Sequence, residues 1–338
     1  MPDPNPLHII VAMDFSDEII ASLRAISPRC HIERHFPNVP DSAWAEAEVL
    51  YTLRHFPDPA QAPRLRWIQS HTAGLDHAIN EPIIRAEDVE VTTASGIHAV
   101  QMAEFCLSMM LAFTYRLPLL FEYQAKAEWP EKRHKIFAPR ELRGQTLGIV
   151  GYGSIGRELA RQAEALGMTV LACKRDMKHL SDDDGYSEPG TGDPDAHIPA
   201  RIYPSEAVSS MASQCDFIVV TVPQVQGAPP IINELVLDHL KKNTVLINVA
   251  RGAVVDEAAL ITALSSGKLA GAALDVFVEE PLPPTSPLWN LDNVILTPHI
   301  SGNSARYHEK AAALFAENLQ RYLEKRPLLN RLDRKRGY

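Results

Sequence analysis

The sequence predicts an α/β protein of two domains, each built on a parallel sheet covered by helices. At 338 residues the chain is long enough to form two hydrophobic cores. Short apolar runs that are typical of buried strands alternate with helical patterns along most of the chain. A glycine-rich turn at 151–156 opens a second series of such runs. We therefore expect residues 1–100 and 303–338 to form one domain and residues 101–302 to form the other.

The first hundred residues alternate strand patterns with helical ones. Residues 17–26 predict a helix. Four apolar runs predict strands, at 7–12, 48–53, 65–69 and 89–93. This alternation favours a parallel sheet covered on both faces. After the first strand, Asp14-Phe-Ser-Asp17 stands where a glycine fingerprint would be needed, so this half is a poor dinucleotide site.

A long apolar helix is expected at 99–123, disturbed at Pro118, and it would carry the chain into the second domain. The polar segment that follows, 124–142, carries Trp129 and Phe137. Exposed aromatic side chains on a projecting segment are typical of a subunit contact. A covered surface loop is the alternative interpretation.

The glycine turn organises the second domain. It lies between an expected strand at 146–150 and an expected helix at 157–166. Gly151 suits the tight turn, Gly153 lets the backbone approach a pyrophosphate, and Gly156 allows close packing of helix on strand. The helix would point its unpaired N–H groups at that anion. The pattern predicts a nucleotide-binding unit with a Rossmann-type doubly wound sheet.

Further strands are expected along the second domain. They lie at 168–173, 217–221, 244–248, 269–275 and 294–297. Residues 181–199 interrupt this series with a polar insertion rich in aspartate, glycine and proline. We interpret the insertion as a mobile surface loop and assign it no function. The last helix, expected at 304–324, should leave this domain and pack on the first.

Two cations stand at the end of the second strand of this unit, at Lys174 and Arg175. A unit that binds NAD usually has an acid there, which binds the 2′-hydroxyl of the ribose. Cations would attract a 2′-phosphate instead, which favours NADP over NAD. In the alternative interpretation both cations are solvated and Asp176 binds the ribose.

An arginine, an acid and a histidine follow three other expected strands. Arg251 precedes a glycine, and its guanidinium could bind a carboxylate with two parallel hydrogen bonds. Asp275 begins an acidic segment that includes Glu279 and Glu280, and His299 follows the last strand. Oxidation of a 2-hydroxy acid needs a base, a cation for the carboxylate and a hydride acceptor. Histidine suits proton transfer near neutral pH, and an adjacent carboxylate favours its charged form.

These motifs together resemble those of the D-isomer-specific 2-hydroxyacid dehydrogenases. The resemblance rests on Gly151-x-Gly-x-x-Gly156, Asn248-Val-Ala-Arg-Gly-Ala-Val-Val-Asp-Glu257, Asp275-Val-Phe-Val-Glu-Glu-Pro281 and Thr297-Pro-His-Ile-Ser-Gly302. They stand in the family's order, and the resemblance extends over nearly the whole chain. It implies that residues 101–302 bind the cofactor, and that a smaller flavodoxin-like α/β domain binds the substrate.

The resemblance also implies roles for individual residues. His299 would be the general acid and base, paired with Glu280, and Arg251 would bind the carboxylate and carbonyl oxygen of the substrate. Asp275 would receive the nicotinamide carboxamide. In the first domain, Ala73 and Gly74 would offer backbone N–H groups to the carboxylate, although a plain glycine turn is an equal alternative. The remaining residues expected at the cofactor are Ser154, Ile155, Pro223 and Ala250.

Two departures from the family pattern stand out. Val222–Ala228 lacks a threonine that commonly serves the cofactor side. His98 stands where the family often has asparagine, so it either alters substrate choice or caps the following helix.

We therefore predict an NAD(P)-dependent D-2-hydroxyacid dehydrogenase that works as a 2-ketoacid reductase. A nucleotide-sensing protein like the co-repressors of this fold is one alternative, but no part of the catalytic set is lost. A phosphite dehydrogenase relative is another. A formate dehydrogenase relative is disfavoured, because that branch has glutamine where Glu280 stands.

Composition limits the partners and the compartment. The formal net charge of −9 argues against nucleic acid as a partner. The N-terminus lacks the basic start and apolar core of a signal peptide, and the apolar segment 105–121 is too short to span a bilayer. The cysteines are far apart, which favours reduced core residues over disulfides or a metal site. We expect a soluble cytoplasmic protein, and the family habit implies a homodimer.

Overall fold

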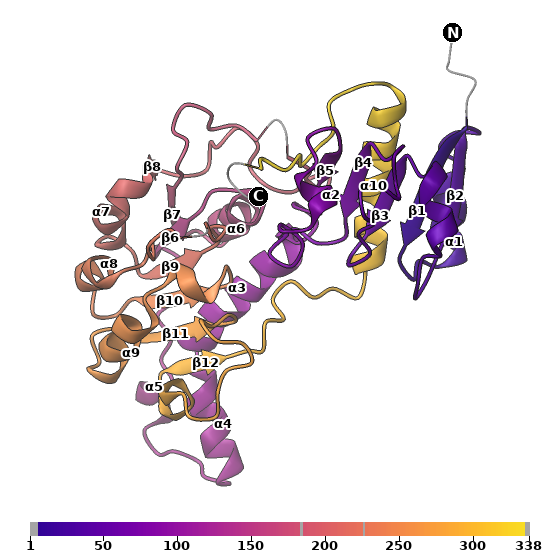
Figure 1. Ribbon diagram of the computed structural model, residues 1–338. Helices are drawn as coiled ribbons and strands as arrows, with labels where there is room; N and C mark the ends of the chain where they lie inside the picture. The colour runs from indigo at the N-terminus through magenta and orange to yellow at the C-terminus, as the bar shows by residue number, and fades with distance from the viewer. Residues whose placement is uncertain (1–5, 183–184, 226, 335–338) are drawn as a thin grey trace. The chain divides into compact units, whose positions relative to one another are not determined.

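The computed structural model describes residues 6–182, 185–225 and 227–334, and it divides into two units (Figure 1). Unit 1 comprises Met1–Ile97, Asp184–Glu188 and Ser304–Tyr338. Unit 2 comprises His98–Asp183 and Pro189–Asn303. This division differs from the predicted one in that a short part of the insertion groups with unit 1. The predictions about residues 1–5 and the end of the chain lie outside the described residues.

Unit 1 contains a five-stranded parallel sheet in the order β2-β1-β3-β4-β5, which is the flavodoxin-like order (Figure 1). The strands are β1 (Leu7–Ala12), β2 (Cys30–Arg34), β3 (Val49–Thr52), β4 (Trp67–Ser70) and β5 (Glu90–Thr92). The predicted parallel sheet is confirmed. β2 was not predicted, because this edge strand exposes three of its five side chains and shows no apolar run.

The final helix, α10 (Tyr307–Leu323), belongs to the core of unit 1, as predicted. Leu314 and Phe315 are fully buried and pack in one cluster with Tyr51 and Trp67. At the start of the unit, the Ser16 hydroxyl accepts a hydrogen bond from the first turn of α1 and so begins that helix. The other helices of the unit are α1 (Asp17–Arg24), η1 (Asp41–Glu46) and α2 (Pro82–Arg85).

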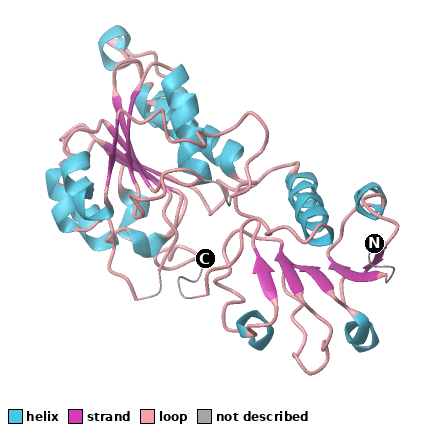
Figure 2. Ribbon diagram, turned by 90° about the horizontal axis from the view of Figure 1, so that it is seen from above, coloured by secondary structure: helices cyan, strands magenta, loops and turns pink. Residues whose placement is uncertain are grey.

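Unit 2 contains a seven-stranded parallel sheet in the order β12-β11-β10-β9-β6-β7-β8, with helices on both faces (Figure 2). Its strands are β6 (Thr146–Val150), β7 (Thr169–Cys173), β8 (Arg201–Tyr203), β9 (Phe217–Val220), β10 (Val245–Asn248), β11 (Gly271–Leu274) and β12 (Val294–Leu296). The strand order reverses between β6 and β9, which is the topological switch point of a Rossmann-type sheet. The predicted fold class is confirmed. Among the described strands of this unit, β8 was missed, because it follows the polar insertion and has a single aliphatic residue, Ile202, between Arg201 and Tyr203.

In unit 2, two helices take the place of the single long helix that was predicted at 99–123. The chain over 99–123 forms α3 (Ala99–Thr114) and α4 (Leu117–Ala125), bent by 62° at a break where Arg116 has a positive φ of 52°. Pro118 lies in the first turn of α4, where its missing N–H is not needed. The other helices of the unit are α5 (Arg133–Ile136), α6 (Ser154–Ala165), η2 (Ser205–Ala207), α7 (Val208–Ala212), α8 (Glu234–His239), η3 (Gly252–Val254), α9 (Glu257–Ser265) and η4 (Pro287–Asn290).

Over the described residues, no single helix has the length and apolar character to span a membrane, although α3 and α4 together reach both as a bent pair. The cysteines are unpaired and buried, as predicted for core residues. Burial raises the pKa of the Cys215 thiol to about 12 and that of Cys173 to about 11.

The insertion at 181–199 was expected to be mobile, but its described residues are held by buried side chains of the glycine-turn region. The guanidinium of Arg157, which is 2% exposed, donates to the carbonyl oxygens of Leu180 and Asp193. The Tyr152 hydroxyl donates to Asp193 Oδ2 at 2.6 Å. The Gly192 N–H donates to the Glu158 carboxylate in the same region. Composition gave no sign of these long-range partners.

Candidate active site

The glycine turn at the switch point has the geometry its sequence predicts. Gly151 follows β6 with a positive φ of 109°, and the Thr221 hydroxyl holds its carbonyl oxygen at 2.7 Å. At Gly156, a Cβ atom would lie 2.4 Å from that same carbonyl oxygen. Only glycine therefore lets α6 pack this closely on the end of β6.

The N-terminus of α6 fits an anionic group. Gly153 precedes the helix in extended conformation, and a Cβ atom there would meet nothing within 4 Å. The first helical hydrogen bond runs from Arg157 N to Gly153 O, so the N–H groups of Ser154, Ile155 and Gly156 precede it. Open space beside three amide donors at a helix start suits the pyrophosphate of a dinucleotide. The predicted turn residues are brought together in this way.

The three polar residues at the end of β7, which were expected near the ribose, differ in their contacts. Lys174 Nζ donates to the carbonyl oxygens of Leu180 and Ser181, at 3.0 and 3.4 Å, and so binds the insertion. Arg175 is exposed. The Asp176 carboxylate is engaged in its own turn, where a hydrogen bond from the His179 ring is the main cause that lowers its pKa to about 2. The backbone N–H of Lys178 is a second donor to it.

The three other predicted site residues follow adjacent strands. β10, β11 and β12 are parallel neighbours, so their carboxyl ends lie at one edge of the sheet. A Cβ atom on Gly252 would lie 1.9 Å from the carbonyl carbon of Phe277. The absence of a side chain at Gly252 therefore lets the loop with Arg251 pack directly on the loop that leads to Glu280.

The carboxylate of Glu280 and the ring of His299 form a hydrogen-bonded pair, with Oε2 2.8 Å from Nδ1. Glu280 Oε1 accepts a hydrogen bond from Phe277 N at 3.0 Å, which orients the carboxylate. The two side chains are 36% and 47% exposed, so the pair is accessible to a small molecule. Nδ1 is bound to the acid, and the opposite ring nitrogen, Nε2, points away from it. Glu279, the other acid considered, is exposed.

Asp275 is buried and organises the loop that carries His299. Its Oδ1 accepts from Thr297 Oγ1 at 2.6 Å and from Ile300 N at 2.9 Å, and its Oδ2 accepts from Ser301 N at 2.8 Å. A carboxylate can accept about four hydrogen bonds, so Asp275 can receive one more donor. The residue predicted to receive a carboxamide thus also positions the histidine loop.

Asn248 at the end of β10 clamps the turn that presents Arg251. Its side chain donates to Arg251 O at 3.0 Å and accepts from Ala250 N at 3.1 Å. The half-buried Arg251 donates through Nη1 to Ala250 O at 2.8 Å. No role was predicted for Asn248 itself. The only signal was a polar side chain at the end of an otherwise buried strand.

The remaining predicted residues lie at other loops. Pro223 follows Val222, whose Cγ1 would be 2.9 Å from a Cβ atom on Gly151. His98 is the N-cap residue of α3, where its carbonyl oxygen accepts from Met102 N, but its side chain makes no capping hydrogen bond. Its Cδ2 would lie 3.2 Å from a Cβ atom on Gly302.

Ala73 and Gly74 belong to unit 1, where they follow β4 in a half-buried loop. The Thr72 hydroxyl donates to Gly74 O at 2.7 Å and shapes that loop. Within unit 1 it lies at the carboxyl edge of the sheet, where open α/β sheets bind ligands.

A doubly wound parallel sheet with a glycine turn at its switch point defines a dinucleotide-binding α/β protein, and the acid–histidine pair after its last strands adds a group for proton transfer. Comparison with known proteins then gives the family. Residues 107–301 match the model described as D-isomer specific 2-hydroxyacid dehydrogenase, NAD binding domain. The chain belongs to this family of NAD(P)-dependent oxidoreductases of 2-hydroxy acids and 2-ketoacids.

Individual relatives agree with this assignment. A glyoxylate reductase of Thermofilum pendens is 34% identical over 259 residues, which cover 76% of this chain and 72% of the relative. An (S)-sulfolactate dehydrogenase of Chromohalobacter salexigens is 33% identical over 264 residues, covering 78% and 79%. Among solved structures, a D-isomer specific 2-hydroxyacid dehydrogenase of Xanthobacter autotrophicus in complex with NADPH and MES superposes with a TM-score of 0.78 at 28% identity. It covers 99% of this chain and 100% of that one.

Proposed function

We propose that this protein reduces a small 2-ketoacid to the corresponding D-2-hydroxy acid, with NADPH as the preferred cofactor. The observation that carries the proposal is the hydrogen-bonded pair of His299 Nδ1 and Glu280 Oε2, 2.8 Å apart. This pair and Arg251 lie in loops at the same edge of the sheet. The loops therefore provide a proton donor and a guanidinium that can bind the carboxylate of the substrate.

The residues of the chain have separate tasks in this reaction. Protonated His299 gives the proton on Nε2 to the substrate oxygen, while Glu280 holds the ring through Nδ1 and stabilises its positive charge. Arg251 binds the carboxylate with its planar guanidinium and polarises the carbonyl group. A bound nicotinamide cofactor supplies the hydride. Asp275 keeps the histidine loop in place through its three hydrogen bonds.

In unit 1, we propose that the loop with Ala73 and Gly74 can bind a carboxylate. Backbone N–H groups of such a loop bind a carboxylate without needing a charged side chain. The hydrogen bond from Thr72 to Gly74 O supports a defined loop conformation.

The relatives support a proposal for the substrate class. Several curated relatives that are 32–34% identical to this chain are glyoxylate reductases. Glyoxylate has a carboxylate and a carbonyl group with no side chain, so it satisfies Arg251 and His299 without a further pocket. We therefore propose glyoxylate and other short 2-ketoacids as substrates.

A panel of 2-ketoacids, assayed with NADPH and with NADH, tests the proposal. We expect turnover of glyoxylate or hydroxypyruvate, a higher kcat/KM with NADPH, and a D-configured product wherever the product is chiral. Failure to turn over any 2-ketoacid with either cofactor would overturn the proposal.

The preference for NADPH is supported by the end of β7. Arg175 is exposed there, while the Asp176 carboxylate that would otherwise bind the ribose is engaged with the His179 ring at 2.9 Å. A guanidinium can bind a 2′-phosphate with two parallel hydrogen bonds. The related structure from Xanthobacter autotrophicus was solved with NADPH.

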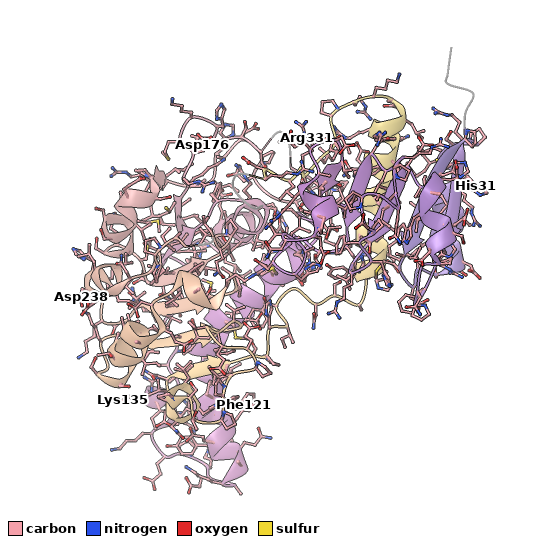
Figure 3. All side chains as sticks on the ribbon, in the orientation of Figure 1. His31, Phe121, Lys135, Asp176, Asp238 and Arg331 are labelled. Atoms are coloured by element: carbon pink, nitrogen blue, oxygen red, sulfur yellow. The ribbon has the colours of Figure 1, made fainter. Side chains whose placement is uncertain are left out.

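We also propose a homodimer formed through the segment around α4 and the following residues up to Leu142. This segment exposes large apolar side chains, among them Phe121, labelled in Figure 3, at 59% and Trp129 at 80%. Light scattering tests the proposal. A dimer that dissociates in the Trp129→Ser or Phe121→Ser variant supports it, and a monomeric wild-type protein contradicts it.

The cytoplasm remains the proposed compartment. Four buried, unpaired thiols support a reducing environment. Cell fractionation followed by immunoblotting tests this, and recovery of the protein in an oxidising compartment would contradict it.

A further inference from the structure

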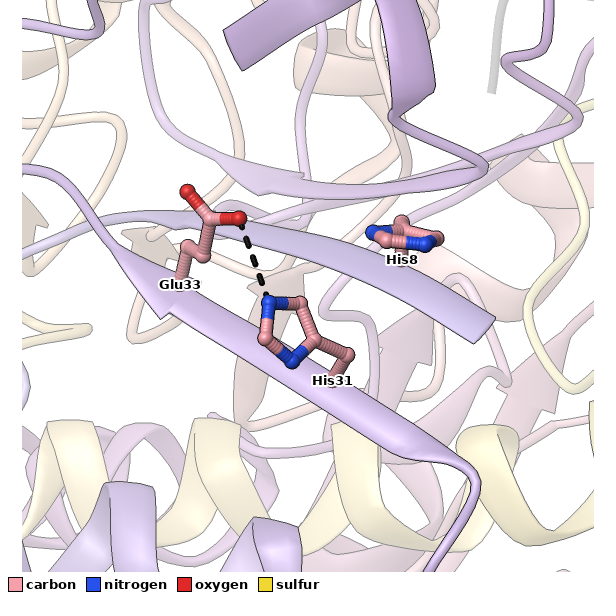
Figure 4. A group of neighbouring side chains, drawn as sticks. All are labelled: His8, His31 and Glu33. Atoms are coloured by element: carbon pink, nitrogen blue, oxygen red, sulfur yellow. Dashed lines mark ion pairs between the residues drawn. The ribbon is translucent and has the colours of Figure 1, made fainter. Parts of the chain in front are cut away.

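Three side chains that the proposed reaction does not use come together on the edge of the sheet in unit 1. They are His8 on β1 and His31 and Glu33 on β2, and their possible ligand atoms all lie within 4.8 Å of one another (Figure 4). β2 is the edge strand of the sheet. The group therefore lies where water and ions have access.

The parallel pairing of β1 and β2 accounts for this arrangement. His8 and His31 are register partners, so their side chains leave the sheet on the same face from strands about 4.8 Å apart. Glu33 is two residues after His31 and therefore shares that face. Ile32 lies between His31 and Glu33 in the sequence, and its side chain is buried on the opposite face of the sheet. This burial prevents the side chains of His31 and Glu33 from turning inward.

The measured contacts show that the three groups face one another. The rings of His8 and His31 lie edge to face, with centroids 5.2 Å apart. His31 Nε2 lies 3.4 Å from Glu33 Oε1, the ion pair drawn in Figure 4. The side chains of His31 and Glu33 are 59% and 48% exposed, so both can adjust by small rotations.

We propose that His8, His31 and Glu33 form a binding site for a divalent transition-metal ion of the Zn²⁺ class. Two imidazole nitrogens and one carboxylate oxygen are a typical ligand set for such an ion, whereas Ca²⁺ and Mg²⁺ prefer oxygen ligands only. Three protein ligands leave a fourth position for water.

A fourth residue supports the carboxylate. His35 Nε2 lies 3.1 Å from Glu33 Oε2, the oxygen that is not paired with His31. A hydrogen bond to the second oxygen of a ligating carboxylate fixes its orientation. His35 is thus a positioning residue for the site.

A bound ion would link the edge strand β2 to the rest of the sheet. β1 and β2 are joined by backbone hydrogen bonds, and a bound ion adds ligands from both strands. Because an ion that binds only the folded state stabilises it, Zn²⁺ should raise the melting temperature.

Isothermal titration with Zn²⁺ on the full-length chain, free of affinity tags and stripped of metal, tests the proposal. We expect about one ion per chain in wild type, with affinity lowered more than about tenfold in the His8→Ala, His31→Ala and Glu33→Gln variants. The His35→Ala variant should retain the site with weaker affinity. Titration with Mg²⁺ should give no comparable signal.

The matched control is His179→Ala. His179 and Asp176 form another exposed histidine–carboxylate pair, at 2.9 Å, but within a single turn and with only two ligands. This variant should bind Zn²⁺ as wild type does, and its melting temperature should still rise with Zn²⁺, whereas that of His31→Ala should not. The proposal is overturned if wild type binds no Zn²⁺, or if the His8 and His31 variants bind it unchanged.

Discussion

Glu280 and His299 come from the loops after two adjacent parallel strands, β11 and β12, and their side chains meet at 2.8 Å. A second acid of the β11 loop, Asp275, holds the β12 loop by three hydrogen bonds. The position of the imidazole is therefore determined by two carboxylates with different tasks. One contacts the ring and the other contacts the backbone around it.

Replacement of His299 by alanine should lower kcat for ketoacid reduction by a factor of about 10² to 10⁴, the usual contribution of a positioned general acid. Cofactor affinity, measured by fluorescence titration, should remain unchanged, because the glycine turn at 151–156 does not depend on the imidazole. Turnover close to wild type would remove His299 from the proposed role.

Glu280→Gln retains a hydrogen-bonding side chain but loses the negative charge beside His299. We expect kcat for ketoacid reduction to fall, because the carboxylate 2.8 Å from Nδ1 no longer stabilises the positive charge of the ring that gives up the proton. Glu279→Gln, at the exposed neighbouring acid, is the control and should leave kcat unchanged.

Two glycines of unit 2 should respond differently to alanine. At Gly252 a Cβ atom would lie 1.9 Å from the backbone of Phe277, so Gly252→Ala should lower the free energy of unfolding by about 1 to 3 kcal/mol. At Gly153 a Cβ atom meets nothing within 4 Å. Gly153→Ala should therefore change stability by less than about 0.5 kcal/mol but weaken cofactor binding.

Urea unfolding and cofactor titration on the two glycine variants separate these effects. A Gly153 variant that loses stability but binds cofactor normally would contradict the assignment of this turn to the pyrophosphate.

Arg175→Ala should lower kcat/KM with NADPH by about tenfold or more, the loss expected when a charge-assisted contact to a phosphate disappears. The value with NADH should change little, because that cofactor has no 2′-phosphate. Lys178→Ala removes an exposed cation three residues away and should affect neither cofactor. Equal losses with both cofactors in the Arg175 variant would contradict a role in NADPH recognition.

Asp193 should make a pH-dependent contribution to stability. Burial raises the pKa of its carboxyl, but hydrogen bonds outweigh this effect and the net shift is downward. The donors are Tyr152 Oη, Ile198 N and His197 N. Because the folded pKa is lowered, the stabilisation is present above the unfolded value of about 3.9 and is lost as pH falls through the folded value.

Asp193→Asn should therefore lower the free energy of unfolding by about 1.5 to 3 kcal/mol at pH 7, as expected for the loss of hydrogen bonds to a charged group. The difference from wild type, measured by urea unfolding, should be constant above about pH 5 and should narrow below about pH 4. Asp195→Asn, at an exposed acid two residues away, is the control and should cost little at any pH. A cost for Asp193→Asn that does not vary with pH would show that its charge is unimportant.

Local signals in the sequence were sufficient for the main elements of both sheets. β1 and β6 have the predicted bounds, since an apolar run between turn residues is a short-range pattern. Gly151 and Gly156 were interpreted correctly for the same reason: one depends on its own backbone conformation and the other on one close neighbour. Family motifs pointed to His299 and Glu280, whose side chains lie together in the structure.

Partners distant in the sequence were decided by the tertiary structure alone. The sequence determined that Asp275 and Arg157 are charged residues near a strand end or a glycine turn. Packing decided that Asp275 binds the histidine loop and that Arg157 is buried. The physical reason is that hydrogen-bond partners depend on which segments the folded sheet brings within about 3 Å, and no local pattern encodes that distance.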